Sequence, residues 1–281
     1  MRYFLAVAKE ENIHRAAESE HVSAAALSKA VSRLEEELGV SLFSRRGRGI
    51  QLSENGRLLQ DRASDILQRE ESARVELGGR THGFNVSIGG PEILLAKYGI
   101  QIANRLREKY PKTHFEFKTL SEDAVGKSVK LGEVWLGLGT LTPPRELTSK
   151  VLERSVPFQT FVGKTHPLSK FSGKVIPVEE VLKYEFVSFP RFLVGNVGDR
   201  LSPDGWRDDK FPRKIGFRVS NLSVLTEILR EGLAVAYVPN HVGHALGLQA
   251  LEISGCPYEC KQKVYLITKD ASMTGWVKSL F

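Results

Sequence analysis

Residues 13–56 read IHRAAESEHVSAAALSKAVSRLEEELGVSLFSRRGRGIQLSENG. The first eight predict a short helix, and His21-Val22 predicts a tight turn after it. Ser23 is a good N-cap for a second helix, because its hydroxyl can accept a hydrogen bond from a free amide of the first turn. Apolar residues at intervals of four, three and four mark the buried stripe of that helix: Leu27, Val31, Leu34 and Leu38. The inner side of a preceding short helix is predicted from Phe4, Leu5, Val7 and Ala8.

The opposite face of the second helix is small and polar. Its members are Ser23, Ala24, Ala25, Ser28, Lys29, Ser32 and Arg33. Downstream, Arg45, Arg46 and Arg48 lie within four positions with no acid among them, and residues 50–52 alternate like a returning strand. Two helices followed by a basic hairpin predict a winged helix-turn-helix, which places one helix in the major groove and arginines near phosphates. Periodicity alone leaves open an ordinary amphipathic helix in a small helical domain.

A long helix is predicted after this hairpin. Ser53 caps it, and Glu54 lies in the first turn, where the helix dipole favours an acid. We expect the helix to reach about Leu77 and to end at Gly78-Gly79. Five residues follow a heptad seam that is interrupted only by Glu70: Leu59, Ala63, Ile66, Ala73 and Leu77. This seam predicts a dimerising linker helix; packing on the chain's own downstream domain is the alternative.

Composition limits the remaining function classes. The 281 residues suggest two or three domains, 41% of them hydrophobic, with no apolar run long enough to span a membrane. The start, MRYFLAVAKEEN, lacks the order of a signal peptide, and two cysteines (Cys256 and Cys260) fit a reducing compartment, so we expect a cytoplasmic protein. The first 80 residues carry 13 basic and 13 acidic side chains, which places the net charge of +7 downstream. The local arginine cluster, and not the net charge, therefore indicates DNA binding by this segment.

The remaining 200 residues alternate strands with helices. This alternation predicts parallel sheets with right-handed crossovers. Strands of a first set are expected at residues 85–89, 114–120 and 134–138. A second set is expected at 158–162, 185–189, 216–219 and 234–238, and a last strand at 264–268 is expected to return to the first set.

The pattern "RAAE…VS…LS…LEEELGVSLFSRRGRG…LSENG" resembles the DNA-binding end of the LysR-type transcriptional regulators. The later stretches KYP (109–111), THPLSK (165–170) and EGLAVAYVP (231–239) are similar to the effector domain of the same family. The resemblance implies a winged helix-turn-helix over 1–53, a linker helix over 54–79 and a two-subdomain α/β effector domain of periplasmic-binding-protein type over 80–281. Subdomain I would comprise residues 80–157 and 247–281, and subdomain II residues 158–246.

The resemblance also implies partners. A homodimer through the linker helix, and a homotetramer built from two dimers, would bind an interrupted palindrome of double-stranded DNA under the control of a small effector. It places Ser23, Ser28, Lys29, Ser32 and Arg33 in or beside the major groove, and Arg45, Arg46 and Arg48 on the wing. Where the family commonly has Gln-Pro, this chain has Ala24-Ala25, so apolar contact replaces a bidentate contact to adenine. Trp135 stands where the family often has Asp.

The effector cleft is expected at strand C-termini and helix N-termini. The candidate residues are Gly90, Pro91, Glu92, Ile93, Leu120, Ser121, Glu122, Thr140, Phe189, Arg191, Asn221 and Pro239. Glu92 and Glu122 would repel an anion, and Arg191 could offset one of them. An organic acid and a neutral or amine-bearing ligand therefore both remain open.

Other chemistry has weak support in the sequence. His241 and His244 could share a metal, but no third ligand is evident, and Cys256 with Cys260 fits a surface loop as well as a redox pair. We find no nucleotide-binding glycine motif and no nucleophile elbow, so no cofactor and no enzymatic activity are expected. The alternatives are a constitutive DNA-binding regulator with a vestigial cleft, a solute-binding protein and an α/β enzyme.

Overall fold

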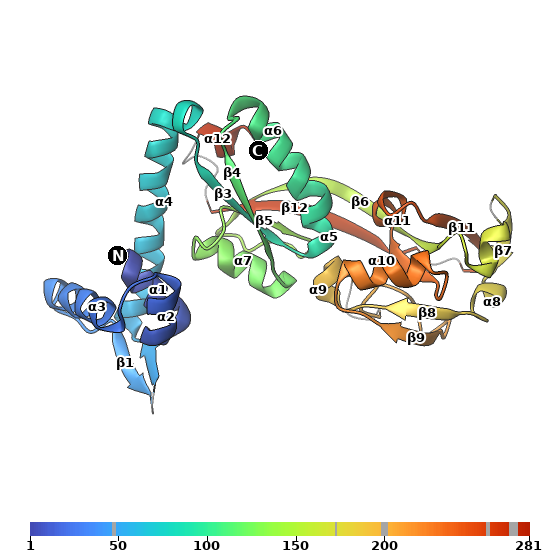
Figure 1. Cartoon of the computed structure of the whole chain (residues 1–281), viewed down its shortest axis with the longest axis horizontal. Helices are drawn as coiled ribbons and strands as arrows, with labels where there is room; N and C mark the ends of the chain where they lie inside the picture. Colours follow the sequence, from blue (N-terminus) through green and yellow to red (C-terminus); the bar gives the residue numbers. More distant parts are fainter. Residues whose placement is uncertain (47–48, 172, 198–201, 257–258, 270–274) are drawn as a thin grey trace. The chain divides into compact units, whose positions relative to one another are not determined.

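The computed structural model describes residues 1–46, 49–171, 173–197, 202–256, 259–269 and 275–281. It divides into two units: residues 1–78 with 130–132, and residues 79–129 with 133–281. Figure 1 shows the order of the elements along the chain. Arg48 lies outside the described residues, and so does the side chain of Arg46.

The first unit is a helix-turn-helix followed by a hairpin and a long helix. Its elements are α1 (Arg2–Glu10), α2 (Ile13–Ser19), α3 (Ala24–Leu38), β1 (Phe43–Arg46), β2 (Gly49–Leu52) and α4 (Glu54–His82). Leu27 and Val31 of α3 pack against α1 and α2 in one apolar core, while Phe4 and Leu42 belong to a second. The strands of the hairpin are antiparallel, with Phe43 opposite Leu52. The predicted winged helix-turn-helix is confirmed.

The predicted caps are present. The Ser23 hydroxyl accepts a hydrogen bond from Ala26 N at 3.2 Å, and the Ser53 hydroxyl accepts one from Gly56 N at 3.0 Å. His21 in the turn adopts a left-handed backbone with φ 55°. These bonds satisfy backbone donors that a helix start leaves free, so the sequence sets these boundaries locally.

Two local predictions were wrong. Leu38 is 48% exposed rather than buried, because it is the last residue of α3 and the chain leaves the core at Gly39. The helix α4 also continues through Gly78-Gly79 to His82. Glycine inside a helix costs only about 1 kcal/mol relative to alanine and does not force an end. The left-handed residue that ends α4 is Gly83, with φ 79°.

The second unit begins with a sheet of mixed direction. Strands β3 (Asn85–Gly90), β4 (His114–Thr119) and β5 (Leu136–Gly139) are parallel to one another. β12 (Lys261–Thr268) returns antiparallel to β5 and to β6 (Thr148–Val162), so the fully parallel sheet that we expected is wrong. A last strand that arrives from the far end of the domain enters in the reverse direction. The predicted return of this strand to the first set is confirmed.

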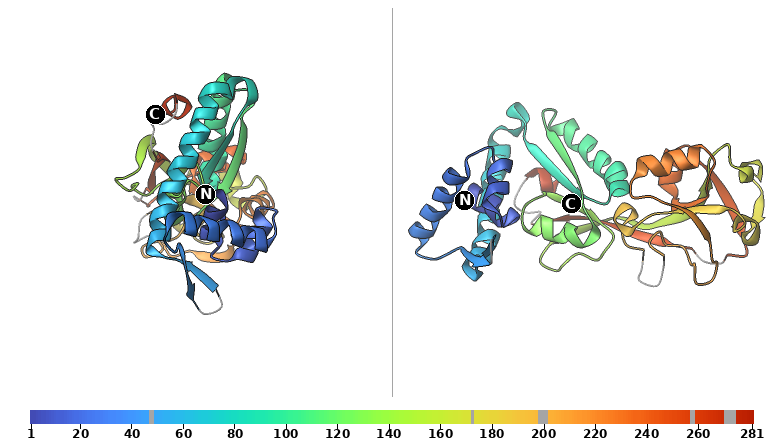
Figure 2. Two further views of the ribbon diagram at one scale, coloured as in Figure 1. Left: turned by 90° about the vertical axis from the view of Figure 1, so that its left-hand side faces the viewer. Right: turned by 60° about the horizontal axis from the view of Figure 1, so that its bottom comes forward.

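Helices cover both faces of this first half, as Figure 2 shows for α6 and α7. α5 (Glu92–Leu94), a π-turn (Leu95–Gly99) and α6 (Ile100–Lys109) form one interrupted helix after β3. α7 (Glu122–Lys130) follows β4, and α12 (Gly275–Lys278) lies near the end of the chain. Glu122 therefore begins a helix directly after a parallel strand, at the edge of the sheet where α/β folds bind ligands.

The second half is built on the far end of β6. That end pairs with β10 (Ala236–Pro239) and β11 (Gln249–Ser254), and β11 pairs with β7 (Val175–Pro177). β8 (Glu185–Ser188) and β9 (Lys214–Arg218) form a separate parallel pair. The remaining helices are a 3₁₀ turn (Pro167–Phe171), α8 (Val178–Val181), α9 (Arg191–Val194), α10 (Leu222–Arg230) and α11 (Asn240–Ala245).

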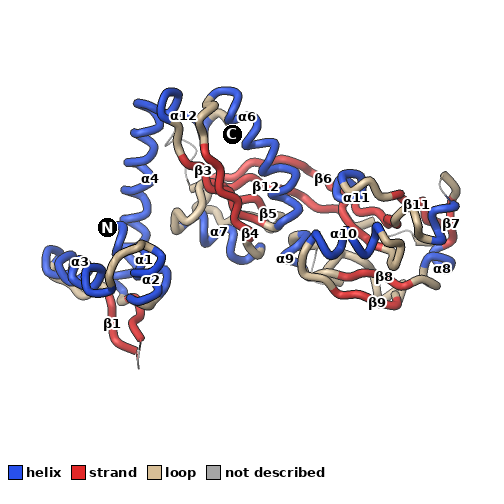
Figure 3. Tube along the Cα trace, in the orientation of Figure 1, coloured by secondary structure: helices blue, strands red, loops and turns tan. Residues whose placement is uncertain are grey.

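Figure 3 shows β6 and β12 as long neighbouring strands that connect the two halves. From the sequence we expected a strand only at 158–162, although proline, which cannot donate a ladder hydrogen bond, is tolerated where that bond is not needed. In the structure β6 starts at Thr148 and runs through Pro157. The pairing of β11 also places residues 249–254 with the second half, whereas the expected boundary put 247–281 in the first. Leu251 packs with Val162 and Phe186 in the core of that second half.

Candidate functional site

The exposed face of α3 carries the predicted polar residues. Ser23, Ala25, Lys29, Ser32 and Arg33 are exposed. Ala24 and Ser28 are half-buried, and Ala24 packs against the apolar core of this unit. The face is therefore divided into a fully accessible strip and a border that contacts neighbouring elements.

That border lines a concavity of about 650 Å³ in the first unit. Its walls are the loop and first turn of α2, the start of α3 and the hairpin. The lining residues are Glu11, Asn12, Ile13, His14, Ala24, Ser28, Arg45, Gly49 and Ile50. Folding thus brings Ala24, Ser28 and Arg45 to one concave surface. Asn12 and His14 were not predicted, although Asn12 has a recognisable signal as the N-cap of α2, accepting from His14 N at 2.9 Å.

The charges around this surface are held in different ways. Arg33 Nε lies 2.9 Å from Glu37 Oε1, and both side chains are exposed. Such exposed pairs are weak, so Arg33 can leave Glu37 and bind another anion instead. Glu35 accepts hydrogen bonds from Leu42 N at 2.6 Å and Phe43 N at 3.2 Å, so its carboxylate fixes the entry to the hairpin.

In the second unit, Glu122 and Thr140 of the predicted cleft come together. Oε1 of Glu122 accepts hydrogen bonds from Thr140 N at 2.9 Å and from the Thr140 hydroxyl at 2.8 Å. Oε2 accepts from Thr140 N at 3.0 Å and from Leu141 N at 3.3 Å. The carboxylate at the start of α7 thus binds the amides that follow β5.

Two residues that the sequence analysis missed extend this network into the second half. Asn196 N donates to the Thr140 hydroxyl at 2.7 Å. Gln262, a buried residue of β12, donates through Nε2 to Asn196 O at 3.0 Å and to Val194 O at 2.8 Å. Glutamine at an inward position of a strand was the only sequence signal, and nothing local connects it to residues 66 and 68 positions away.

Glu92 makes a second contact between the halves. Its Oε2 accepts a hydrogen bond from Leu222 N at 3.3 Å, at the start of α10. The side chain of Asn221 caps the same helix by accepting from Val224 N at 2.9 Å. Both acids that were expected to repel an anion therefore already bind backbone amides.

Most of the other predicted cleft residues are buried or half-buried. Gly90, Pro91, Ile93, Phe189 and Pro239 are buried; Leu120 and Arg191 are half-buried; Ser121 is exposed. Gly90 O accepts from Leu120 N at 3.0 Å, which joins two of these loops. A hollow of about 340 Å³ lies beside them between α5–α6 and α10–α11, lined by Ile93, Ala96, Lys97, Gln101, Leu222, His241, Val242, Ala245 and Leu246.

His241 and His244 pack against different aromatic rings. The ring centroid of His241 lies 6.0 Å from that of Tyr98, and His244 lies 5.5 Å from Phe161. Burial, together with the nearby Lys97, lowers the pKa of His241 to about 4. Within the described residues, no three His, Cys, Asp or Glu side chains gather as metal ligands.

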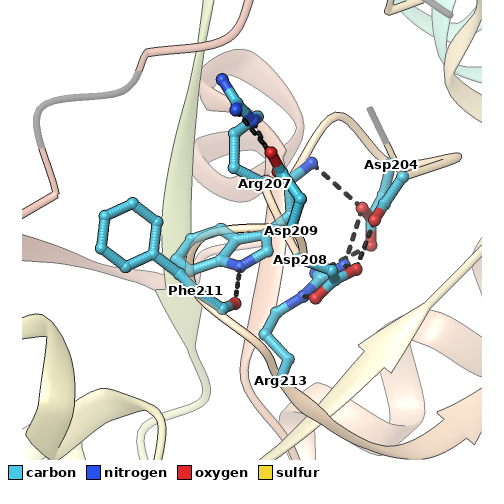
Figure 4. Close-up of polar contacts among 8 residues, drawn as sticks. Asp204, Arg207, Asp208, Asp209, Phe211 and Arg213 are labelled. Carbon is cyan, nitrogen blue, oxygen red and sulfur yellow. Dashed lines mark hydrogen bonds and ion pairs between the residues drawn. The ribbon is translucent and has the colours of Figure 1, made fainter. Parts of the chain in front are cut away.

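A buried ionic cluster lies within residues 204–213 of the second half (Figure 4). The Arg213 guanidinium, fully buried, makes paired hydrogen bonds to Asp204 at 3.0 Å and to Asp208 at 2.8 Å. It also lies 5.3 Å from the Phe186 ring and 5.2 Å from the Trp206 ring. Burial acts to raise the pKa of Asp208, but hydrogen bonds from Arg213 and Ser202 outweigh it and hold that pKa below its usual value.

Comparison with known proteins identifies both units. Residues 1–57 match the family described as bacterial regulatory helix-turn-helix protein, lysR family, and residues 84–275 match the LysR substrate binding domain. The chain belongs to the LysR family. It is a LysR-type DNA-binding transcriptional regulator with an effector-binding domain, as the resemblance predicted.

Relatives of this LysR-type regulator cover nearly all of its length. The uncharacterized HTH-type transcriptional regulator YcgK of Bacillus subtilis is 25% identical, over 98% of this chain and 90% of its own. Full-length OxyR C199D from Pseudomonas aeruginosa shares the fold, with a TM-score of 0.65 and 18% identity over 99% of this chain and 90% of its own. Full-length CbnR in complex with its target DNA has a TM-score of 0.57 and 18% identity, over 99% and 96%. In the described parts of this regulator, no helix is long and apolar enough to cross a membrane.

Proposed function

We propose that α3 of this LysR-type regulator reads the major groove and that the hairpin contacts phosphates. The base-reading face is Ser23, Ala24, Ala25, Ser28, Lys29, Ser32 and Arg33, with Arg45, Arg46 and Arg48 on the wing. The observation that carries the proposal is the shared concavity, which Arg45 lines together with Ala24 and Ser28. The crystal structure of full-length CbnR, which has the same fold, contains its target DNA.

We also propose dimerisation through α4 (54–82), which links a DNA-binding domain over 1–53 to the effector domain that follows it. Ile66 is 48% exposed, Leu77 is 90% exposed, and Ala73 between them is exposed as well. They belong to the predicted five-residue seam, in which Leu59 is half-buried and Ala63 is buried within the chain itself. In a coiled coil the three exposed members would be buried against the same face of a second copy. A two-fold dimer predicts an interrupted palindrome as the operator, and two dimers would form a homotetramer. As a regulator of bacterial transcription, the protein would act in the cytoplasm.

The effector is proposed to bind between the two halves of the second unit. The twelve predicted cleft residues remain the candidates for its site, and the apolar hollow that Ile93 lines together with Leu222 offers space for a small ligand. An effector controls DNA binding only if it binds one arrangement of the subunits better than another. A constitutive regulator is the second candidate, and it is favoured by one observation: the Glu122 carboxylate already occupies the amides that follow β5.

Selection of bound sequences from a random DNA pool by the purified full-length protein tests this function. We expect an interrupted palindrome whose binding weakens as salt rises. The same selection with Ser32→Ala should shift the preferred bases within each half-site, whereas Ser19→Ala in α2 should not. Enrichment of a single undivided half-site would contradict the dimer, and no enrichment by folded protein would contradict sequence-specific binding.

A further inference from the structure

A cluster of hydrogen-bond donors lies just after β5, where Asn196 of the second half contacts Thr140. The amides of Thr140 and Leu141 and the hydroxyl of Thr140 point at one position. Free amides after a parallel strand are where α/β folds bind anionic ligand groups. In this chain the position is filled by the carboxylate of Glu122, which receives all three donors. Hydrogen bonds to an ionised carboxylate are the stronger kind.

The surrounding backbone is fitted to that carboxylate. Gly195 has φ 87°, and a Cβ at this residue would lie 2.6 Å from Glu122 Oε1 and 2.9 Å from the Thr140 hydroxyl. A Cβ at Gly139 would lie 3.1 Å from Glu122 Oε2. The backbone at Gly195 and Gly139 therefore packs directly against the Glu122 carboxylate. A second carboxylate does not fit at this position while Glu122 occupies it.

The carboxylate also connects the halves. The Thr140 hydroxyl lies 2.8 Å from Glu122 Oε1 and 3.1 Å from Asn196 O, either of which can accept its proton, and it accepts a hydrogen bond from the Asn196 amide of the second half. Gln262 holds Asn196 O from the strand that runs through both halves. Within the described residues no cation pairs with Glu122, so amides and one hydroxyl alone bind this charge.

We infer that Glu122 is an internal ligand: its carboxylate occupies the place of an effector carboxylate and holds the cleft closed without one. This inference rests on the proposed position of the cleft. It assigns a specificity role to Glu122, because its carboxylate already occupies these three donors in the intact protein. Removal of the side chain would convert the same donors into a binding site for a small carboxylate.

The test uses the full chain with formate and acetate as probes. Glu122→Ala should unfold at a lower temperature than the wild type, and saturating formate should restore roughly 3 °C relative to chloride at the same ionic strength. Isothermal titration should detect formate binding to this variant and none to the wild type. The matched control is Asp123→Ala, which removes the same charge from the same helical turn at an exposed position and should behave like the wild type.

A second variant protects the test against a folding failure. Glu122→Gln keeps the volume but removes the charge, and we expect faster hydrogen exchange at the Asn196 amide with no formate binding. The inference is overturned if the wild type binds formate as tightly as Glu122→Ala, or if the Asn196 amide in Glu122→Gln exchanges as slowly as in the wild type. DNA binding by the wild type is measured separately, so failure of the proposed function would be seen there and not in the formate titration.

Discussion

The exposed face of α3 and the cleft around Glu122 differ in what binds their polar groups. On α3, Lys29 and Ser32 are exposed, and within the described residues Arg33 pairs with the exposed Glu37. In the cleft, amides and a hydroxyl are bound by Glu122, and at the start of α10 an amide is bound by Glu92. A surface that must receive a partner leaves its groups available, whereas a surface whose groups are already bound resists a new ligand. Changes on α3 should therefore alter binding, and changes in the effector half should alter stability.

The largest effect is expected at the buried ionic cluster of the effector half. Arg213→Ala leaves Asp204 charged and buried without its partner, which costs about 3–5 kcal/mol in the free energy of unfolding. Chemical denaturation measures it. The control Arg230→Ala removes the partner of the exposed Glu227, and its loss of unfolding free energy should be much smaller because both side chains are exposed. Equal losses in the two variants would refute the role of burial.

A smaller effect, on binding alone, is expected on α3. Arg33→Ala should lose about 1–3 kcal/mol of discrimination between the selected operator and random DNA. Its thermal midpoint should stay near that of the wild type, because the side chain is 79% exposed. Gel-shift titrations with both DNAs give the ratio. An unchanged ratio would exclude Arg33 from base reading.

The hairpin should respond differently. Arg45→Ala should weaken binding to all sequences about equally and reduce the slope of log affinity against log salt by about 1. Titrations at several salt concentrations measure that slope. Lys9→Ala, a change of the same charge near the end of α1, serves as the control. A loss confined to the operator would assign Arg45 to base contacts instead.

The smallest effect concerns His241. Its pKa of about 4 in the folded state lies below the ordinary 6.5, so the unfolded chain takes up the proton first. The stability contributed by the neutral ring is fully present above pH 6.5 and is lost as the pH falls towards 4. His241→Gln cannot take up this proton, so its thermal midpoint should fall less than that of the wild type between pH 7 and pH 5. Parallel curves for the two proteins would contradict the shifted pKa.

Local signals in the sequence predicted the DNA-binding unit well. The Ser23 cap, the Leu27–Val31 stripe and the hairpin each depend on residues close together in the chain. The errors at Leu38 and at Gly78-Gly79 concern helix ends, where the cost of continuing or stopping a helix is small. The family resemblance gave the two-half architecture of the effector domain but not its strand directions.

The cleft was only partly predictable. Glu92 and Glu122 were predicted as cleft residues, and we expected both carboxylates to repel an anionic ligand. What binds them depends on Leu222 and on Thr140, which is 18 positions from Glu122 in the chain. Asn196 and Gln262 were missed because their role is created by contacts across the domain. Such donor–acceptor matches are fixed by tertiary structure and leave no periodic trace.

The pairing of β6 with β12 constrains how the effector domain can move. Two continuous paired strands resist bending about an axis perpendicular to them. They can twist about their length, as two-stranded β-ribbons do. The ladder between them is irregular at Gln262–Val264 and Val264–Tyr265, and bulges are where extra twist is taken up. Gln262 holds Asn196 from this irregular point. Twisting of these two strands would therefore rotate one half of the effector domain against the other about the strand direction, whereas a hinge motion would open the cleft by bending the strands.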